Sequence, residues 1–149
     1  MTAVAPGAAL YLDTSCLLKL FFREPETRAV AELLATEERV LVSELGRLEA
    51  ETQLRARLHG GLLSRAQHRR LLAELTRTLT LEPFSLIAFP VDGFERARAL
   101  TVRTKAHCRT LDLLHMAVMD SVGLTRIFTN DLAQANVARA LGFTVTTPL

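Results

Sequence analysis

Residues 8–22, AALYLDTSCLLKLFF, decide how the rest of the chain can be interpreted. The stretch Ala8–Asp13 predicts a short buried strand that ends on an acid. The following stretch, Ser15–Phe22, has the apolar spacing of a helical turn or two. Because a buried strand that leads directly into a helix is typical of α/β domains, we expect Asp13 at the carboxyl end of the first strand of a parallel sheet.

Strand-like and helix-like periodicity alternate along the remainder of the chain. Further strands are expected at Arg39–Ser43, Phe84–Pro90, Arg126–Thr129 and Phe143–Thr146. Helices are expected at Glu26–Glu37, Glu44–His59, Ser64 to about Thr80, Asp92 to about Lys105, Thr110 or Asp112 to about Gly123, and Asn130 or Asp131 to Leu141. This alternation predicts an α/β fold, a three-layer α/β/α sandwich with a parallel sheet of about five strands.

Length and composition fit a single domain that spans residues 1–149. With 49% apolar and 23% charged residues, the chain can bury a core of ordinary size, which excludes disordered and fibrous classes. The longest apolar stretches, such as Leu17–Phe22, are too short to span a membrane, and Lys19 interrupts this one. Residues 1–9 lack the basic start of a signal peptide, so we expect a cytoplasmic protein with no membrane partner.

Cysteine and arginine usage add little to this outline. Cys16 and Cys108 are too few for a disulfide framework, and their apolar neighbours favour core packing for both. The net charge is only +2, but just two of the 18 basic residues are lysines, Lys19 and Lys105. The planar donor fork of arginine fits phosphate, although a GC-rich genome also favours arginine. The composition is therefore compatible with nucleic-acid binding but does not establish it.

Four acids fall near the carboxyl edge of the predicted sheet. Asp13 ends the first strand, and Asp131 follows the strand Arg126–Thr129. Asp112 lies at a helix start in the apolar stretch TLDLLHMAVM, and Glu49 lies in the helix after the second strand. Ligands of parallel sheets bind beyond the carboxyl ends of the strands. We therefore expect these four side chains to share one site.

Such a cluster of carboxylates has a definite chemistry. Clustered carboxylates repel one another, and the cluster is stable when it is protonated or holds a cation. Oxygen ligands suit Mg²⁺ or Mn²⁺, which can contact a phosphodiester oxygen and promote deprotonation of water. Each acid alone also has an ordinary explanation, with Asp13 and Asp131 as helix N-caps, Asp112 favouring a helix dipole, and Glu49 solvated. Their joint position at one edge favours the metal site.

Four segments resemble the PIN-domain family, and more narrowly the VapC-type toxins of bacterial and archaeal toxin–antitoxin pairs. The segments are LYLDTSCLLKLF around Asp13, VSELGRLEAE around Glu49, RTLDLLHMAVM around Asp112 and IFTNDLAQANVARALGF around Asp131. They follow one another in the family's order, and together they extend over nearly the whole chain. The fold that the family implies agrees with the α/β sheet expected from periodicity.

The resemblance implies a metal-dependent endoribonuclease that hydrolyses RNA phosphodiester bonds with Mg²⁺ or Mn²⁺. In this sequence the catalytic and metal-binding residues would be Asp13, Glu49, Asp112 and Asp131. The family also implies a homodimer and a small antitoxin protein that covers the active site. The RNA target, the number of metal ions and the identity of the antitoxin are left open.

Supporting roles are expected for residues beside the acids. Ser15 and Thr129 are placed to hydrogen-bond the acids or a metal-bound water, with local turn or cap bonding as the alternative. Arg109 lies close to Asp112 and is the candidate for a contact with a substrate phosphate. His115 is expected to be a packed histidine that positions its helix rather than a general base.

Two assignments are less constrained by the sequence. Glu49 is chosen by its register, but Glu44 and Glu51 lie on the same predicted helix and are not excluded by periodicity. Leu111 is expected on an apolar helix face together with His115. A leucine-rich helical surface compatible with a dimer, which could equally be core, comprises Leu33, Leu34, Leu71, Leu72 and Leu75.

Three other functions fit parts of the sequence. A PIN-fold nuclease for RNA processing would lack an antitoxin, and the absence of a small upstream reading frame would favour it. A signalling module of the receiver type would need a second acid beside Asp13, where Tyr11, Leu12 and Thr14 stand instead. A non-catalytic interaction module would not need four intact acids at one edge.

Overall fold

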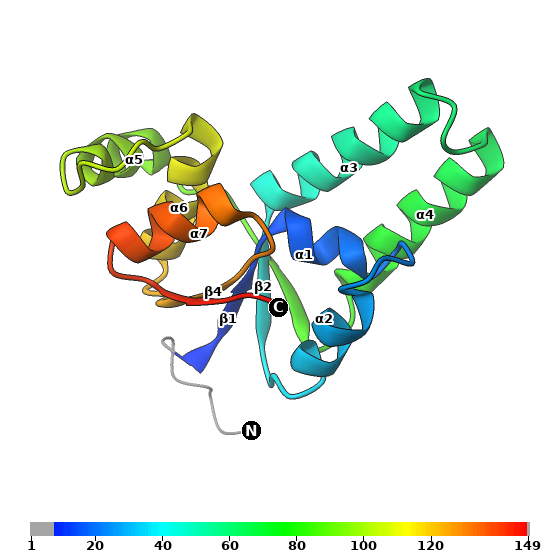
Figure 1. Ribbon diagram of the computed structural model, residues 1–149, viewed down its shortest axis with the longest axis horizontal. Helices are drawn as coiled ribbons and strands as arrows, with labels where there is room; N and C mark the ends of the chain where they lie inside the picture. The colour runs from blue at the N-terminus through cyan, green and yellow to red at the C-terminus, as the bar shows by residue number, and fades with distance from the viewer. Residues whose placement is uncertain (1–7, 149) are drawn as a thin grey trace.

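The structure, a computed structural model, describes residues 8–148 and has one parallel sheet at its centre (Figure 1). The spatial order of the strands is β3-β2-β1-β4-β5, and every neighbouring pair is parallel. The strands are β1 (Leu10–Leu12), β2 (Val40–Ser43), β3 (Phe84–Ile87), β4 (Arg126–Phe128) and β5 (Thr144–Thr146). The predicted parallel sheet of about five strands is therefore confirmed.

Helices connect each strand to the next, as expected for crossovers between parallel strands. Within the described residues they are α1 (Thr14–Lys19), α2 (Thr27–Leu34), α3 (Glu44–His59), α4 (Arg65–Thr78), α5 (Gly93–Thr101), α6 (Thr110–Ser121) and α7 (Leu132–Ala140). Several boundaries differ from the prediction by two to four residues, and the ends of α5 and β3 have a visible cause. Helix α5 ends at Thr101 rather than near Lys105, because the Thr104 hydroxyl accepts from the Ala106 amide and so supports a turn. Strand β3 ends at Ile87 because its partner β2 ends there in register.

The two long helices α3 and α4 have clear sequence signals at their ends. The Ser43 hydroxyl caps α3 by accepting from the Gly46 amide at 3.0 Å. Gly61 follows α3 with a φ of 74°, a left-handed conformation that glycine adopts without strain. Ser64 and Gln67 then form a capping box at the start of α4.

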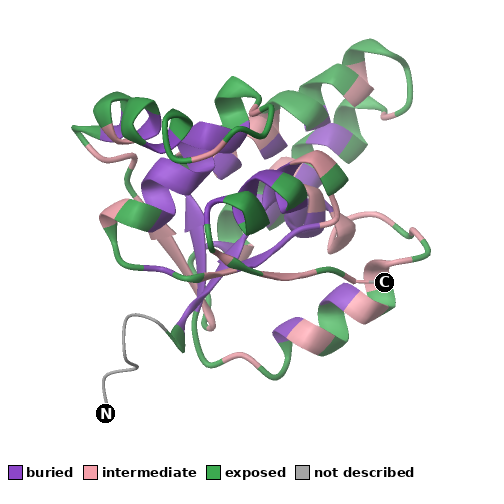
Figure 2. Ribbon diagram, turned by 60° about the vertical axis from the view of Figure 1, so that its left-hand side comes forward, coloured by how far each residue is buried: buried purple, intermediate pink, exposed green. Residues whose placement is uncertain are grey.

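The sheet separates two hydrophobic cores, which confirms the three-layer sandwich. Leu10 and Leu12 face the core beneath α1–α4, whereas Tyr11 faces the core beneath α5–α7, as the period of two in a strand requires. Figure 2 shows this buried interior between exposed helical surfaces. The leucine-rich surface considered for a dimer belongs to the α1–α4 core. Its members are buried or packed against that core, namely Leu33, Leu34, Leu71, Leu72 and Leu75.

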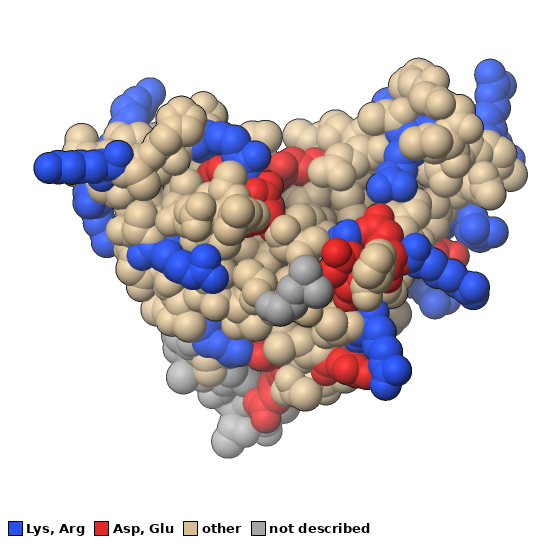
Figure 3. Space-filling view, viewed as in Figure 1, with Lys and Arg blue, Asp and Glu red and all other residues tan. Residues whose placement is uncertain are grey.

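Two pairs of helices rise on either side of the carboxyl edge of the sheet. Helices α3 and α4 lie on one side of this edge, and α5 and α6 lie on the other (Figure 1). Figure 3 shows a hollow between these two walls with acidic side chains at its base. Among residues 8–148, no helix has the length and hydropathy that crossing a membrane requires.

Candidate active site

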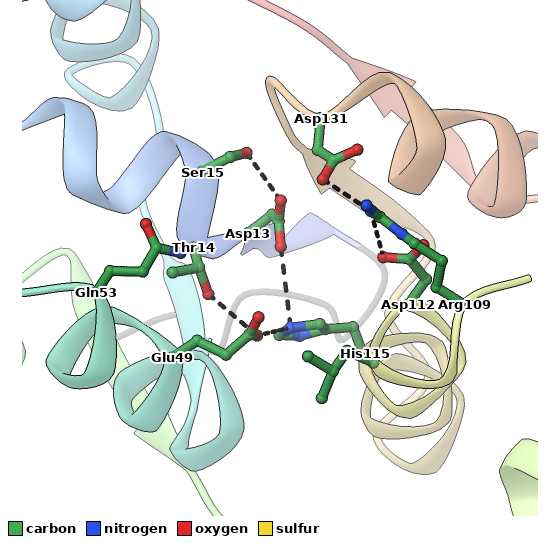
Figure 4. A pocket seen from close by; sticks show the side chains of 10 residues that line it. Asp13, Thr14, Ser15, Glu49, Gln53, Arg109, Asp112, His115 and Asp131 are labelled. Atoms are coloured by element: carbon green, nitrogen blue, oxygen red, sulfur yellow. Dashed lines mark hydrogen bonds and ion pairs between the residues drawn. The ribbon is translucent and has the colours of Figure 1, made fainter. Parts of the chain in front are cut away.

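A cavity of about 280 Å³ opens at the carboxyl edge of the sheet, where the sequence places its acids. All four expected acids line this cavity (Figure 4). The complete lining is Asp13, Thr14, Ser15, Glu49, Gln53, Arg109, Leu111, Asp112, His115 and Asp131. The fold thus brings together side chains that lie up to 118 positions apart in the sequence, from 13 to 131.

Asp13 occupies the centre of the site. It directly follows β1, and its backbone amide donates to the Phe128 carbonyl, which fixes it against β4. Its carboxylate accepts at Oδ2 from the hydroxyls of Ser15, at 2.8 Å, and Thr129, at 2.7 Å. Both residues proposed to support the acids are therefore in contact with this carboxylate. Asp13 is also the N-cap residue of α1, but its side chain makes no capping bond, so that alternative is not realised.

Asp131 has two roles that the sequence presented as alternatives. Its Oδ1 caps α7 by accepting from the amides of Ala133 and Gln134, while its Oδ2 accepts from Arg109 at 2.8 Å. Burial alone would raise the pKa of Asp131, but the bonds from Arg109 and from the two amides outweigh it and lower the pKa. The helix cap therefore holds one oxygen and leaves the other toward the cavity.

Asp112 lies in the first turn of α6, where a carboxylate is favoured by the helix dipole. Its two oxygens accept from the guanidinium of Arg109 at 2.7 and 3.0 Å. The hydrogen bonds with Asp112 and then Asp131 raise the pKa of Arg109, so this side chain is a fixed positive charge. Sequence reasoning expected Arg109 to face a substrate phosphate, whereas in this structure it bridges two acids.

Glu49 is the one glutamate of α3 that reaches the cavity. Glu44 is exposed, and Glu51 pairs with Arg47 at 2.9 Å, so neither of these alternatives lines the site. The Thr14 hydroxyl donates to Glu49 Oε1 at 3.3 Å. Of the three glutamates that periodicity left open, Glu49 is the one that lines the cavity, because of the way α3 packs against α1.

His115 is buried as expected, but its ring is also part of the site. Its Nε2 contacts Glu49 Oε1, and its Nδ1 hydrogen-bonds the Tyr11 hydroxyl at 2.5 Å. The expectation for Leu111 was wrong, because Leu111 lies at the exposed mouth of the cavity rather than on the buried face. At the helix start, facing away from the sheet, an apolar side chain has no core to pack into.

Sequence reasoning missed two residues that line the cavity, Thr14 and Gln53, and one buried residue behind it, Tyr11. Tyr11 has a detectable signal, since a buried tyrosine needs a partner for its hydroxyl. Gln53 follows Glu49 by four residues and therefore shares its helix face. Burial raises the pKa of the Tyr11 phenol, the hydrogen bond with Ser43 opposes that shift, and nearby carboxylates add to it. Tyr11 therefore stays protonated and acts as a hydrogen-bonding group.

The cysteines play no part in this chemistry. Burial raises the pKa of Cys16 to about 12, which keeps it a thiol in the α1–α4 core. Cys108 is only half-buried and packs at the margin of the other core, so the expected core packing is complete for Cys16 alone.

The donor set suits a hard divalent cation, although the carboxylates are held as two pairs. Among the described residues, no three Asp, Glu, His or Cys side chains converge into a metal-binding group as they stand. Arg109 bridges Asp112 and Asp131, and His115 separates Asp13 from Glu49. Within residues 8–148, neither Asp13 Oδ1, which lies 3.9 Å from His115 Nε2, nor Glu49 Oε2 accepts a hydrogen bond. Oxygens of this kind in an acid-lined cavity fit Mg²⁺ or Mn²⁺.

A sheet of order β3-β2-β1-β4-β5 with acids from four segments at its carboxyl edge defines an α/β domain of the PIN type. The chain belongs to the PIN-domain family, whose pattern matches residues 10–140. The resemblance found in the sequence is thereby confirmed.

Three known proteins illustrate the similarity. Ribonuclease VapC46 of Mycobacterium tuberculosis is 34% identical over 143 residues, which cover 95% of this chain and 98% of that protein. The crystal structure of VapC20 from the same species, described as a toxin that cleaves the sarcin-ricin loop, superposes with a TM-score of 0.69 and 19% identity over 91% of this chain and 96% of that one. A toxin-antitoxin complex from Klebsiella pneumoniae gives a TM-score of 0.59 at 24% identity, with 95% and 98% coverage.

Proposed function

We propose that this chain is a metal-dependent endoribonuclease and the toxin of a type II toxin–antitoxin pair. The observation that carries the proposal is the set of four carboxylates, from four separate segments, around one cavity at the carboxyl edge of the sheet. The relative named ribonuclease VapC46, which is similar along nearly its whole length, supports the same reaction class. The acid-lined cavity explains how a PIN fold with few aromatic residues would act on a phosphodiester.

The metal site of this proposal comprises Asp13, Glu49, Asp112 and Asp131. A bound Mg²⁺ or Mn²⁺ would supply charge stabilisation for the phosphodiester and lower the pKa of water. The protein itself holds the carboxylates in position. Ser15 and Thr129 fix Asp13, while the amides at the start of α7 fix Asp131.

Arg109 is proposed to contact the RNA backbone after it leaves the acids. Its guanidinium is half-exposed at the mouth of the cavity, next to the position where a phosphate would meet the carboxylates. A cation that occupies the site would compete with Arg109 for Asp112 and Asp131, and the released fork of donors would face the substrate.

The partners follow from the relatives rather than from the geometry. VapC20 is described as a toxin, and the similar structure from Klebsiella pneumoniae is described as a toxin-antitoxin complex. We propose a small antitoxin protein and a homodimer for this chain as well, and a cytoplasmic location where RNA is accessible. The sequences of the cleavage products would identify the RNA target.

The proposal is tested with purified, partner-free protein incubated with total RNA in Mg²⁺, Mn²⁺ or EDTA. We expect discrete cleavage that requires metal and falls at least about 100-fold in Asp112→Asn. Asp120→Asn is the matched control, because Asp120 lies on the same helix but is exposed and pairs with Arg96. Cleavage that persists in EDTA, or equal loss in both variants, would contradict the proposal. So would a folded wild-type protein that cleaves nothing in either metal.

A further inference from the structure

Behind the Glu49 carboxylate, buried polar side chains from three elements form a continuous hydrogen-bonded chain. His115, on α6, contacts Glu49 with Nε2 and the Tyr11 hydroxyl with Nδ1. The Tyr11 hydroxyl, on β1, also hydrogen-bonds Ser43 Oγ at 2.8 Å. Ser43 in turn caps α3, the helix that carries Glu49. The chain therefore closes a loop that starts and ends on the same helix.

The hydrogen-bonded loop holds Glu49 Oε1 in place, whereas Glu49 Oε2 accepts no hydrogen bond from the described residues. Oε1 receives both the His115 ring and the Thr14 hydroxyl. Because a carboxylate can only accept, Nε2 is the nitrogen that presents a hydrogen to it. Within the described residues no donor contacts Oε2, which leaves it to the cavity. A glutamate has three rotatable bonds, so without these contacts its carboxylate would sample several positions.

The same ring separates Glu49 from Asp13. His115 Nε2 lies 3.9 Å from Asp13 Oδ1, so the imidazole stands between two carboxylates that would otherwise repel one another (Figure 4). The ring's own orientation is fixed by Tyr11, whose ring meets it edge-on at a centroid distance of 5.7 Å. Tyr11 is fully buried and does not line the cavity, so it acts on the site indirectly, and the direct link of its hydroxyl to a cavity residue is the bond to His115.

We propose that Tyr11 and His115 are positioning residues that orient the Glu49 carboxylate to receive the divalent cation. This inference rests on the proposed function, since it assigns a role within the same metal site. Tyr11 acts through His115, and His115 acts through Glu49. Partners of metal ligands typically change metal affinity by about 10- to 100-fold when they are removed.

A double-mutant cycle on Mn²⁺ affinity, measured by calorimetry, tests the proposal. Tyr11→Phe removes only the hydroxyl, and we expect it to weaken Mn²⁺ binding about 10-fold in the wild-type background. In a Glu49→Gln background the same substitution should change affinity less than about twofold, because the group it positions is no longer a charged ligand. A merely structural role for Tyr11 would give the same loss in both backgrounds and would overturn the inference.

Two further variants guard against effects of folding. His115→Gln retains an amide donor near Glu49 and should keep more Mn²⁺ affinity than His115→Leu, which has none. His68→Gln is the matched control, since His68 is also buried but lies away from the site on α4. Wild-type protein that binds no Mn²⁺ would refute the metal site and this inference with it. Wild-type binding with unchanged affinity in Tyr11→Phe would refute the inference alone.

Discussion

The two halves of the site hold their acids by different physical means. In the first half, Asp13 and Glu49 accept hydrogen bonds from hydroxyls and from an imidazole that is only 2% exposed. In the second half, Asp112 and Asp131 share one guanidinium whose side chain is 50% exposed. Buried neighbours cannot leave without disrupting the fold, whereas a half-exposed arginine can turn into solvent. The first half, Asp13 and Glu49, is therefore a fixed frame. The second half, Asp112 and Asp131, can exchange the Arg109 guanidinium for another cation.

This difference has a thermodynamic basis. A buried donor or acceptor that loses its partner costs about 1–3 kcal/mol because it is desolvated without compensation. An exposed ion pair contributes about 0–1 kcal/mol, since water and salt screen its charges. Predictions about the two halves should therefore differ in size.

The largest effect is expected on catalysis. Asp13→Asn should slow RNA cleavage by about 10³-fold, because several kcal/mol of metal-derived stabilisation would be lost. Asp131→Asn should slow it only about tenfold, because the single oxygen of asparagine can still cap α7 and the change removes one of the four carboxylates by placing an amide NH2 toward the cavity. Initial rates of cleavage of one defined RNA would measure both. Equal losses in the two variants would contradict the distinction between the halves.

How far the sequence predicts this site depends on the range of each interaction. The rule that ligands bind at the carboxyl edge of a parallel sheet is enough to predict that Asp13, Asp112 and Asp131 lie together. The rotation of α3, which selects Glu49, depends on packing between helices and cannot be derived from the local pattern. The bond between Tyr11 and His115 spans 104 positions and connects the middle of β1 to a helix that is distant in the sequence.

Arg109 is a second example of how far local sequence spacing predicts the contacts of the site. Its proximity to Asp112 was visible in the sequence, because the two residues are three positions apart at a helix start. Its contact with Asp131, 22 positions further on, depends on how α7 lies beside α6. Local spacing thus predicted a basic residue at the site but not the acids that it bridges.

An intermediate effect is expected on stability. Tyr11→Phe should lower the free energy of unfolding by about 1–3 kcal/mol, since Ser43 and His115 both lose a buried partner. Arg109→Gln should lower it by less than Tyr11→Phe does, because the Arg109 side chain is half-exposed and water can reach the Asp131 carboxylate when the pair is broken. Urea denaturation in EDTA, with unchanged m-values, would give both numbers. If Arg109→Gln were the more destabilising change, the second half would not be the exchangeable one.

The smallest effect tests whether Arg109 competes with the cation. Removing its charge frees three carboxylate oxygens, so Arg109→Gln should tighten Mn²⁺ binding by up to about fivefold, the factor that a pair of 0–1 kcal/mol implies. Arg96→Gln is the matched control, because Arg96 also bridges two acids, Asp92 and Asp120, but lies outside the cavity. Its Mn²⁺ affinity should equal that of the wild type in the same calorimetric titration. Weaker binding in Arg109→Gln would mean that the guanidinium gathers the acids for the cation, and the second half would then be part of the fixed frame.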